Sequence, residues 1–214
     1  MKMKLKYGCL FLLLCLFQVG FAQNDKQAAG LVADFIKSVE EGALSTEFVL
    51  TVFGDNDMPV QSQSGLFVMK KGKFSMETQE FTVYFDGKTQ WMYSPSVNEV
   101  SITEPTEEEL AEINPIIILR DYQNKSKIGF SAAEKSAENY VIEMTPVETS
   151  SDYNNIVVWL SKSSKTPLSI KMVYKNGYEI LIVFDNFQKG IKIPENFFVF
   201  DKKNYEGVIE NDLR

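Results

Sequence analysis

The chain has 214 residues, of which 44% are hydrophobic and 24% are charged, and these values are typical of an ordinary globular protein. It contains no histidine and only two cysteines, which excludes Ser-His-Asp and Cys-His triads and any His-ligated zinc or haem site. The net charge of −7 argues against a nucleic-acid partner, because phosphate binding requires a clustered positive surface. Aromatic residues make up 13% of this chain, and together with its poor catalytic inventory they indicate binding of apolar matter.

The N-terminal segment has the pattern of a cleavable secretory signal. Three lysines precede an apolar run from Cys9 to Ala22, which is too short to span a bilayer and ends on small residues. Leu14 is not the small residue expected ahead of a lipid-acceptor cysteine at Cys15, so lipid attachment is not expected. We predict cleavage after Ala22, which leaves residues 23–214 as a single domain in the periplasm. Three lysines and no acidic residue depart with the signal, so the net charge changes from −7 to −10.

The mature chain begins with one helix and continues mainly with strands. Apolar residues recur at helical spacing from Ala28 to Val39, and Gly42 follows the expected helix end. Asp86-Gly87 and Asn176-Gly177 are two-residue hairpin signals, so consecutive strands are expected to form an antiparallel meander. The predicted strands are Glu47–Phe53, Gly65–Met69, Lys73–Glu77, Phe81–Phe85, Gln90–Tyr93, Val100–Thr103, Tyr140–Met144, Ile156–Leu160, Leu168–Tyr174, Glu179–Phe187 and Phe197–Phe200.

One segment, Glu104–Tyr122, interrupts this strand pattern. Thr106 and Glu109 have the spacing of a capping box, and Asn114-Pro115 supplies a cap and a first-turn proline for a second helix. We therefore predict two short helices inserted between strands. The second helix carries a run that is too apolar for an exposed helix, namely Ile116, Ile117, Ile118 and Leu119. This run either plugs a barrel or packs outside it, and we favour the plug.

Several predicted strands are apolar on both faces, which a sheet with one solvated face would not require. Either helices cover the outer face and the inner face lines a barrel, or the chain is a membrane barrel. The helical insert, the short strands and the charged end at Asp212-Leu213-Arg214 argue against a membrane barrel. The predicted fold class is therefore mainly β with helices (α+β), as a barrel or half-barrel capped by helices.

Several sequence segments together resemble the outer-membrane lipoprotein carrier protein family. They are Gly65-Leu66-Phe67-Val68, Lys70-Lys71-Gly72-Lys73-Phe74, the stretch from Phe85-Asp86-Gly87-Lys88-Thr89 to Trp91-Met92-Tyr93-Ser94-Pro95, Asn114-Pro115 and the terminal Asp212-Leu213-Arg214. The resemblance implies an unclosed antiparallel β-barrel with an N-terminal helix and a helical lid, enclosing an apolar cavity for lipoprotein acyl chains. It also implies an inner-membrane ABC-type transporter that supplies the cargo, and delivery to an acceptor at the outer membrane.

Two sets of candidate site residues follow. As a set, the residues expected to line the apolar cavity are Phe67, Phe74, Met76, Phe81, Trp91 and Tyr93, although for any single one of them an ordinary core role is favoured over ligand contact. The family carries an arginine followed by proline ahead of the second segment, and that arginine is thought to hold the lid. Lys70 stands in its place here and is the candidate lid latch; the alternative is a solvated hairpin lysine.

The predicted function is that of a non-enzymatic, monomeric periplasmic carrier that shields the acyl chains of lipoproteins, without cofactor or metal. One alternative is another lipid- or lipoprotein-binding module on the same fold, such as an outer-membrane receptor or an envelope-stress sensor. A second alternative is a hydrolase using Glu77 with Asp86 or Glu99, although nothing in their spacing defines a catalytic geometry.

Overall fold

The structure is a computed structural model that describes residues 25–54 and 57–214. The predicted signal segment and its cleavage point lie outside the described residues. A helix runs through residues 25–41, named the first helix below, and Ala28, Val32, Phe35, Ile36 and Val39 form its buried stripe. This confirms the helix predicted from its apolar spacing.

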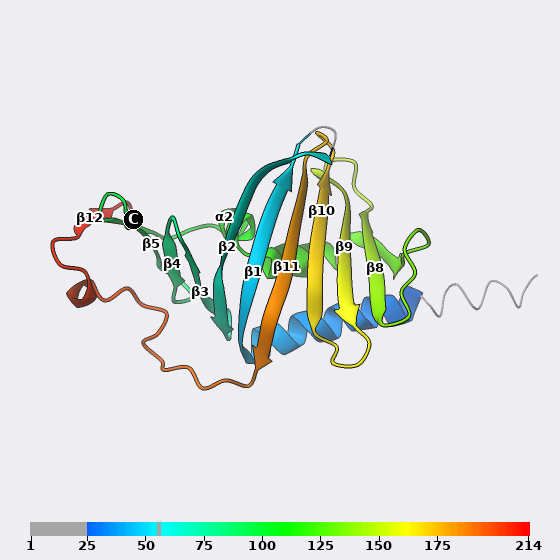
Figure 1. The fold of residues 1–214 in the computed structure, drawn as a ribbon, viewed down its shortest axis with the longest axis horizontal. Helices are drawn as coiled ribbons and strands as arrows, with labels where there is room; N and C mark the ends of the chain where they lie inside the picture. The colour runs from blue at the N-terminus through cyan, green and yellow to red at the C-terminus, as the bar shows by residue number, and fades with distance from the viewer. Residues whose placement is uncertain (1–24, 55–56) are drawn as a thin grey trace, which may run out of the picture.

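The rest of the chain is dominated by strands (Figure 1). In chain order they are β1 (Ala43–Phe53), β2 (Pro59–Lys70), β3 (Lys73–Thr78), β4 (Thr82–Phe85), β5 (Gln90–Ser94), β6 (Glu99–Thr103), β7 (Ser126–Phe130), β8 (Asn139–Pro146), β9 (Tyr153–Ser161), β10 (Pro167–Tyr174), β11 (Glu179–Lys189) and β12 (Ile209–Asp212). Helices α2 (Glu107–Ile113) and α3 (Pro115–Tyr122) separate β6 from β7, and a short 3-10 helix, η2 (Lys202–Asn204), precedes β12.

All the strands of the described residues belong to one sheet, in the order β12-β6-β5-β4-β3-β2-β1-β11-β10-β9-β8-β7. Neighbours are antiparallel except β12, which pairs with β6 in parallel. The sheet consists of two meanders joined through β1 and β11, and β12 and β7 form its two edges, so the barrel is unclosed. The predicted fold class, mainly β with helices in an unclosed antiparallel barrel, is confirmed.

The position of α2 and α3 follows from this strand order. The chain must pass from β6, near one edge, to β7 at the other edge, so the intervening helices have to cross a face of the sheet. They cross the same face that the first helix covers, named the inner face here, and both helical units lie behind the sheet in Figure 1. The main hydrophobic core lies between these helices and the inner face.

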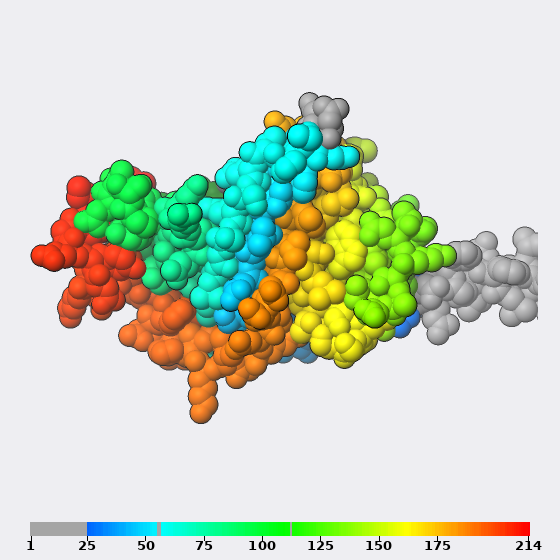
Figure 2. Space-filling view, in the orientation of Figure 1, coloured from blue at the N-terminus to red at the C-terminus, as the bar shows by residue number. Residues whose placement is uncertain are grey.

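The outer face of the central strands is not covered by a helix. Val49 of β1 and Val183 of β11 are directly paired there, and each is 44% exposed. Figure 2 shows this face of the sheet open to solvent. The expectation that helices cover the outer face is therefore wrong, because the helices bury their apolar side chains in the main core on the inner face.

The strand predictions differ from the structure at three places. Residues 197–200 form successive turns instead of a strand, with Phe197 N–H donating to the carbonyl of Pro194. The strands β7 and β12 were not predicted. β7 has five residues and includes a glycine, Gly129, and β12 has only exposed residues, so neither has an alternating buried pattern.

Among the described residues, no helix is long and apolar enough to cross a membrane.

Candidate functional site

A deep apolar pocket lies on the inner face where the first helix, the α2–α3 junction and the central strands meet. Its volume is about 40 Å³. The first helix contributes Phe35 and Val39. The other lining residues are Leu44, Thr46, Phe48 and Leu50 of β1, Phe67 of β2, Met76 of β3, Ile113, Pro115 and Ile116 of the helical pair, Pro167 of β10, and Ile182, Phe184 and Phe187 of β11.

The pocket owes its apolar character to strand alternation. Leu44, Phe48 and Leu50 lie on one face of β1 because side chains alternate along a strand, and Ile182 and Phe184 do the same on β11. Thr46 is the one lining residue with a polar side chain, and its hydroxyl oxygen lies 2.9 Å from two backbone carbonyls, those of Glu47 and Asp185. This hydroxyl is therefore satisfied by the backbone, and the pocket is suited to hydrocarbon.

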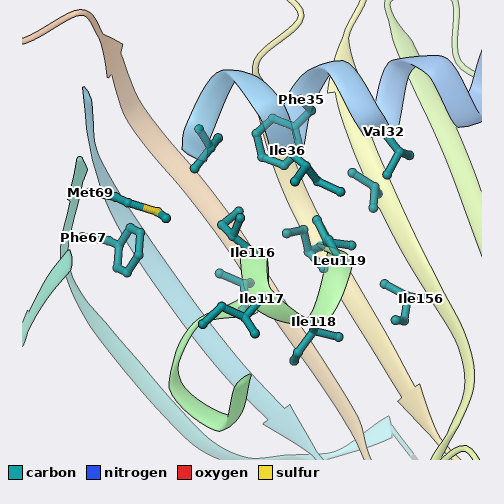
Figure 3. Close-up of a cluster of buried hydrophobic side chains, with 14 of the residues drawn as sticks. Val32, Phe35, Ile36, Phe67, Met69, Ile116, Ile117, Ile118, Leu119 and Ile156 are labelled. Carbon is teal, nitrogen blue, oxygen red and sulfur yellow. The ribbon is translucent and has the colours of Figure 1, made fainter. Parts of the chain in front are cut away.

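The apolar run of α3 is part of the core. Asn114 ends α2 and caps α3, with its side-chain oxygen accepting from the N–H of Ile116 at 3.0 Å, as its position before a proline predicted. The capping box of Thr106 and Glu109 at the start of α2 is also present. The four apolar side chains of α3 are all buried, and Figure 3 shows Ile116 and Leu119 on the side of α3 that is nearer to the first helix. Ile116 lines the deep pocket, so this end of α3 closes the pocket on the helical side.

The predicted cavity residues divide between two places. Phe67 and Met76 line the deep pocket. Phe74 is fully buried behind them, with its ring centroid 5.8 Å from that of Phe67 and 5.3 Å from that of Phe85. Phe81 is partly buried at the margin of the same core.

Trp91 and Tyr93 lie apart from this pocket, in a second cluster, and the prediction that they belong to its wall needs correction. Odd-numbered residues of β5 point to the outer face, whereas Met92 points to the main core. There they pack with Tyr84 against Val100, Phe200, Tyr205 and Val208. The C-terminal segment after β11 thus covers the outer face of β4 to β6, at the end of the sheet where β12 joins β6 (Figure 1).

Lys70 contacts this C-terminal segment and not the α2–α3 pair. Its ammonium donates to the carbonyl of Ile193 at 3.0 Å and to the Glu195 carboxylate at 2.7 Å. The ion pair lowers the pKa of Glu195 below its usual value. The lid-latch prediction for Lys70 is therefore corrected: at the end of β2 the lysine faces the chain that leaves β11, and it anchors that chain.

Arg120, which the sequence analysis did not single out, makes the contact that Lys70 was expected to make. It lies in the last turn of α3, and its guanidinium is 2.7 Å from the Glu107 carboxylate of α2 and 3.7 Å from the Glu40 carboxylate of the first helix. The Glu40 pair joins α3 to the first helix. Arg120 is the one basic residue of α3 and comes 13 residues after Glu107 in the acidic turn of α2, and this charge pattern was the available signal.

The carboxylates considered for hydrolysis are not brought together. The Asp86 carboxylate accepts the backbone N–H groups of Lys88 and Thr89, so it closes the β4–β5 turn. Glu99 contacts Asn211 of β12, and Glu77 lines a groove on the outer face. Within residues 25–54 and 57–214, no cluster of three or more acidic, cysteine or histidine side chains is arranged to hold a metal ion.

The fold and the site define a class of protein: an unclosed β-barrel whose inner face holds an apolar pocket beneath helices. The sequence profile of the family described as outer membrane lipoprotein carrier protein LolA matches residues 20–177. Because this match covers most of the chain, the protein belongs to that family.

Individual proteins are more distant. An outer-membrane lipoprotein carrier protein of Haemophilus influenzae (strain PittEE) is 32% identical over 106 residues, which are 48% of this chain and 50% of the relative. The chain therefore spans about half the length of this curated relative.

Among solved structures, an uncharacterized conserved protein from Thermus thermophilus aligns with a TM-score of 0.53 and 10% identity, over 86% of this chain and 99% of the other. A MucA/MucB complex from Pseudomonas aeruginosa aligns with a TM-score of 0.50 and 12% identity, over 83% of this chain and 62% of the other. At these identities the likeness concerns the fold alone.

Proposed function

We propose that the protein is a carrier that shields the acyl chains of lipoproteins in the deep pocket and moves them through the periplasm from the inner to the outer membrane. The observation that carries this proposal is the chemistry of the pocket: aromatic and aliphatic side chains from the first helix, the helical pair and the strands converge on it, and its hydroxyl is satisfied. Membership of the carrier family supports the same function.

The small volume of the pocket indicates a closed state. Pockets that enclose drug-sized ligands measure about 300–1,000 Å³, whereas this one measures about 40 Å³. An acyl chain enters only if the wall moves. The helices α2 and α3, together named the lid from here on, are the part of the wall that can move without breaking strand pairing. Opening the lid enlarges the pocket along Ile113, Pro115 and Ile116.

The energetics of the lid suit a carrier that must also release its cargo. One acyl chain of about fifteen carbons is worth roughly 12 kcal/mol when it leaves water, at about 0.8 kcal/mol per CH₂. The four buried side chains of α3 regain about 1.5–3 kcal/mol each when the lid closes, or about 6–12 kcal/mol together. Closure therefore competes with the bound chain, and affinity stays low enough for transfer.

The remaining parts of the proposal follow from the family and the N-terminal pattern. The protein is exported, cut after Ala22, and works as a monomer without cofactor. It receives acylated lipoproteins from an inner-membrane ABC-type transporter and delivers them to an acceptor at the outer membrane. Its task is to bind and release, so no covalent step is required. A mature N-terminus at Gln23, read by mass spectrometry of the secreted form, tests the export step.

Two adjacent residues of β1 provide a matched test of binding. Leu50 lines the deep pocket, whereas Val49 points to the outer face. Leu50→Glu places a charge in the path of the acyl chain, and Val49→Glu adds the same charge to the same strand at the solvated face. Binding of a synthetic diacylated lipopeptide is measured by native mass spectrometry, and the thermal midpoint of each variant reports its folding.

We expect the wild type and Val49→Glu to bind the lipopeptide one to one, and Leu50→Glu to lose binding while remaining folded. The same peptide without acyl chains binds none of them. Equal binding by the two variants, or a folded wild type that does not bind, would overturn the proposal. Transfer of a purified lipoprotein between two vesicle populations then tests the carrier step itself.

A further inference from the structure

A second hollow lies beside the deep pocket, on the other side of the α2–α3 junction. Its volume is about 530 Å³, and it lies between the lid and strands β9 to β11. The two cavities share Leu50, Ile113, Pro115 and Ile182 as lining residues. Since Ile113 and Pro115 flank the junction of the two helices, lid movement joins the deep pocket and this hollow into one space.

The lining of the hollow combines polar and apolar side chains, whereas that of the deep pocket is almost entirely apolar. Three tyrosines meet there, and we name it the tyrosine hollow after Tyr122, Tyr153 and Tyr174. The rings of Tyr122 and Tyr153 are 5.1 Å apart in an edge-on arrangement, and those of Tyr153 and Tyr174 are 4.7 Å apart. The hydroxyls of Tyr153 and Tyr174 lie 3.4 Å apart, and Ser151 donates to the Tyr122 hydroxyl at 3.1 Å. Each hydroxyl retains hydrogen-bonding capacity for a ligand.

The phenol of Tyr153 remains a neutral donor. Burial, followed by the hydrogen bond with Tyr174, raises the pKa of Tyr153 well above its usual value. The hollow therefore offers hydrogen bonds to ester or amide carbonyls beside an apolar pocket for hydrocarbon.

The charges around the hollow are mainly negative. Glu108, Asp121 and Asp152 line it, against one cation, Lys125. The neighbouring Lys175 ammonium is engaged by the carbonyl of Thr149 at 2.6 Å. A phosphate placed here would meet three carboxylates and one ammonium, so an anionic lipid head is disfavoured.

We infer that the tyrosine hollow is a head-group site that admits acyl chains on uncharged ester- and amide-bearing heads and rejects anionic phospholipids. This inference rests on the proposed function, since it assigns the head of the ligand whose chains fill the deep pocket. A diacylglyceryl group linked to a peptide has such a head. A carrier that works among membranes rich in phospholipid needs this discrimination, because the acyl chains themselves are the same.

The test compares lipids that share their acyl chains and differ in the head. The assay measures how well each lipid displaces naphthylphenylamine, an apolar fluorescent probe, from the mature protein. The three lipids are dioleoylglycerol, dioleoylphosphatidylglycerol and a cationic dioleoyl trimethylammonium lipid. We expect the anionic lipid to bind more weakly than the other two, with a difference that narrows at high salt because exposed charges are screened. Asp121→Asn and Asp152→Asn should each strengthen binding of the anionic lipid about two- to fivefold and leave dioleoylglycerol unchanged.

Two further variants separate the head from the chains. Glu41→Gln removes a carboxylate from the first helix, away from the hollow, and should leave the lipid preference as in the wild type. Tyr174→Phe should weaken dioleoylglycerol binding without changing the affinity for naphthylphenylamine.

The outcomes distinguish this inference from the proposed function. If none of the diacyl lipids displaces the probe, the proposed function fails. If all three bind alike, or if the two asparagine variants keep the wild-type preference, the head-group assignment is overturned and the carrier function stands.

Discussion

The contact between the lid and the first helix predicts that removing one carboxylate opens the pocket. Glu40→Gln deletes the ion pair between the first helix and Arg120 but keeps the size of the side chain. The two side chains are 36% and 34% exposed and the nitrogen-to-oxygen distance is 3.7 Å, so the pair belongs with partly solvated ion pairs worth about 0.2–1 kcal/mol. The upper value corresponds to about a fivefold change in an equilibrium.

This change acts on the fraction of open lid. When the closed state dominates, the apparent dissociation constant of an apolar ligand varies inversely with the open fraction. Glu40→Gln should therefore tighten binding of naphthylphenylamine by up to about fivefold at low salt, and the difference should shrink at high salt. Fluorescence titration at two salt concentrations measures both effects.

The matched control is the next residue in the chain. Within the part of the chain that the structure describes, Glu41 pairs only with Lys37 on the same helix, at 4.0 Å, and both side chains are 70% exposed. Glu41→Gln removes the same charge and should leave probe affinity unchanged. If Glu40→Gln and Glu41→Gln bind the probe with the wild-type constant while all three proteins have equal unfolding free energies, Arg120 does not hold the lid.

Three other predictions concern stability. Gly65→Ala should destabilise the protein by about 1–3 kcal/mol in urea unfolding, because a Cβ there would collide with the β3 backbone and a core ring. Gly30→Ala, at a position of the first helix with free space around it, should instead stabilise the protein by about 0.5–1 kcal/mol. Equal effects of the two substitutions on the free energy of unfolding would refute the packing argument. Leu119→Ala should lower the free energy of unfolding by about 2–5 kcal/mol, since its side chain is fully buried, and a loss below 1 kcal/mol would mean that α3 is not part of the core. The lowered pKa of Glu195 means that its ion pair with Lys70 stabilises the fold above the usual carboxyl pKa of 4.5 and is lost as the pH falls through the lowered value. Amide protection of residues 190–198 should therefore fall in acid in the wild type and stay level in Glu195→Gln, and parallel behaviour of the two would refute the anchor.

Local patterns in the sequence were sufficient for most of the elements. The helix caps at Thr106 and Asn114 depend on short-range chemistry, and both are present as predicted. The deep pocket was predicted only in part. Phe67 and Met76 line it, whereas Trp91 points to the opposite face of the sheet, because side chains alternate between the two faces along each strand. Choosing the face of β5 that meets the pocket requires the pairing of β4 and β5 within the sheet.

The contacts that hold the lid and the C-terminal segment were not predictable in the same way. Lys70 meets Glu195 across 125 residues of chain, and no periodicity in either segment indicates that contact. Arg120 reaches Glu40 because α3 crosses the inner face, which in turn follows from β6 and β7 lying near opposite edges. Each of these contacts depends on the order of the strands in the sheet. That order cannot be read from a local sequence pattern, because it requires all the strand pairings to be known.

The pairing of β1 with β11 also bears on how the chain reaches its native state. Thr46 and the Asp185 carbonyl, which face each other across this pair, are 139 residues apart in the chain. The strands β1 to β6 and β7 to β11 each form a meander of near neighbours, but the two meanders join only through this long-range pair. Bringing the ends of so long a loop together costs conformational entropy before the contacts of the core can stabilise the pairing, and this slows folding. The rate-limiting step should therefore be docking of the two half-sheets, and a nascent chain that ends before residue 179 has no partner for β1 on that side.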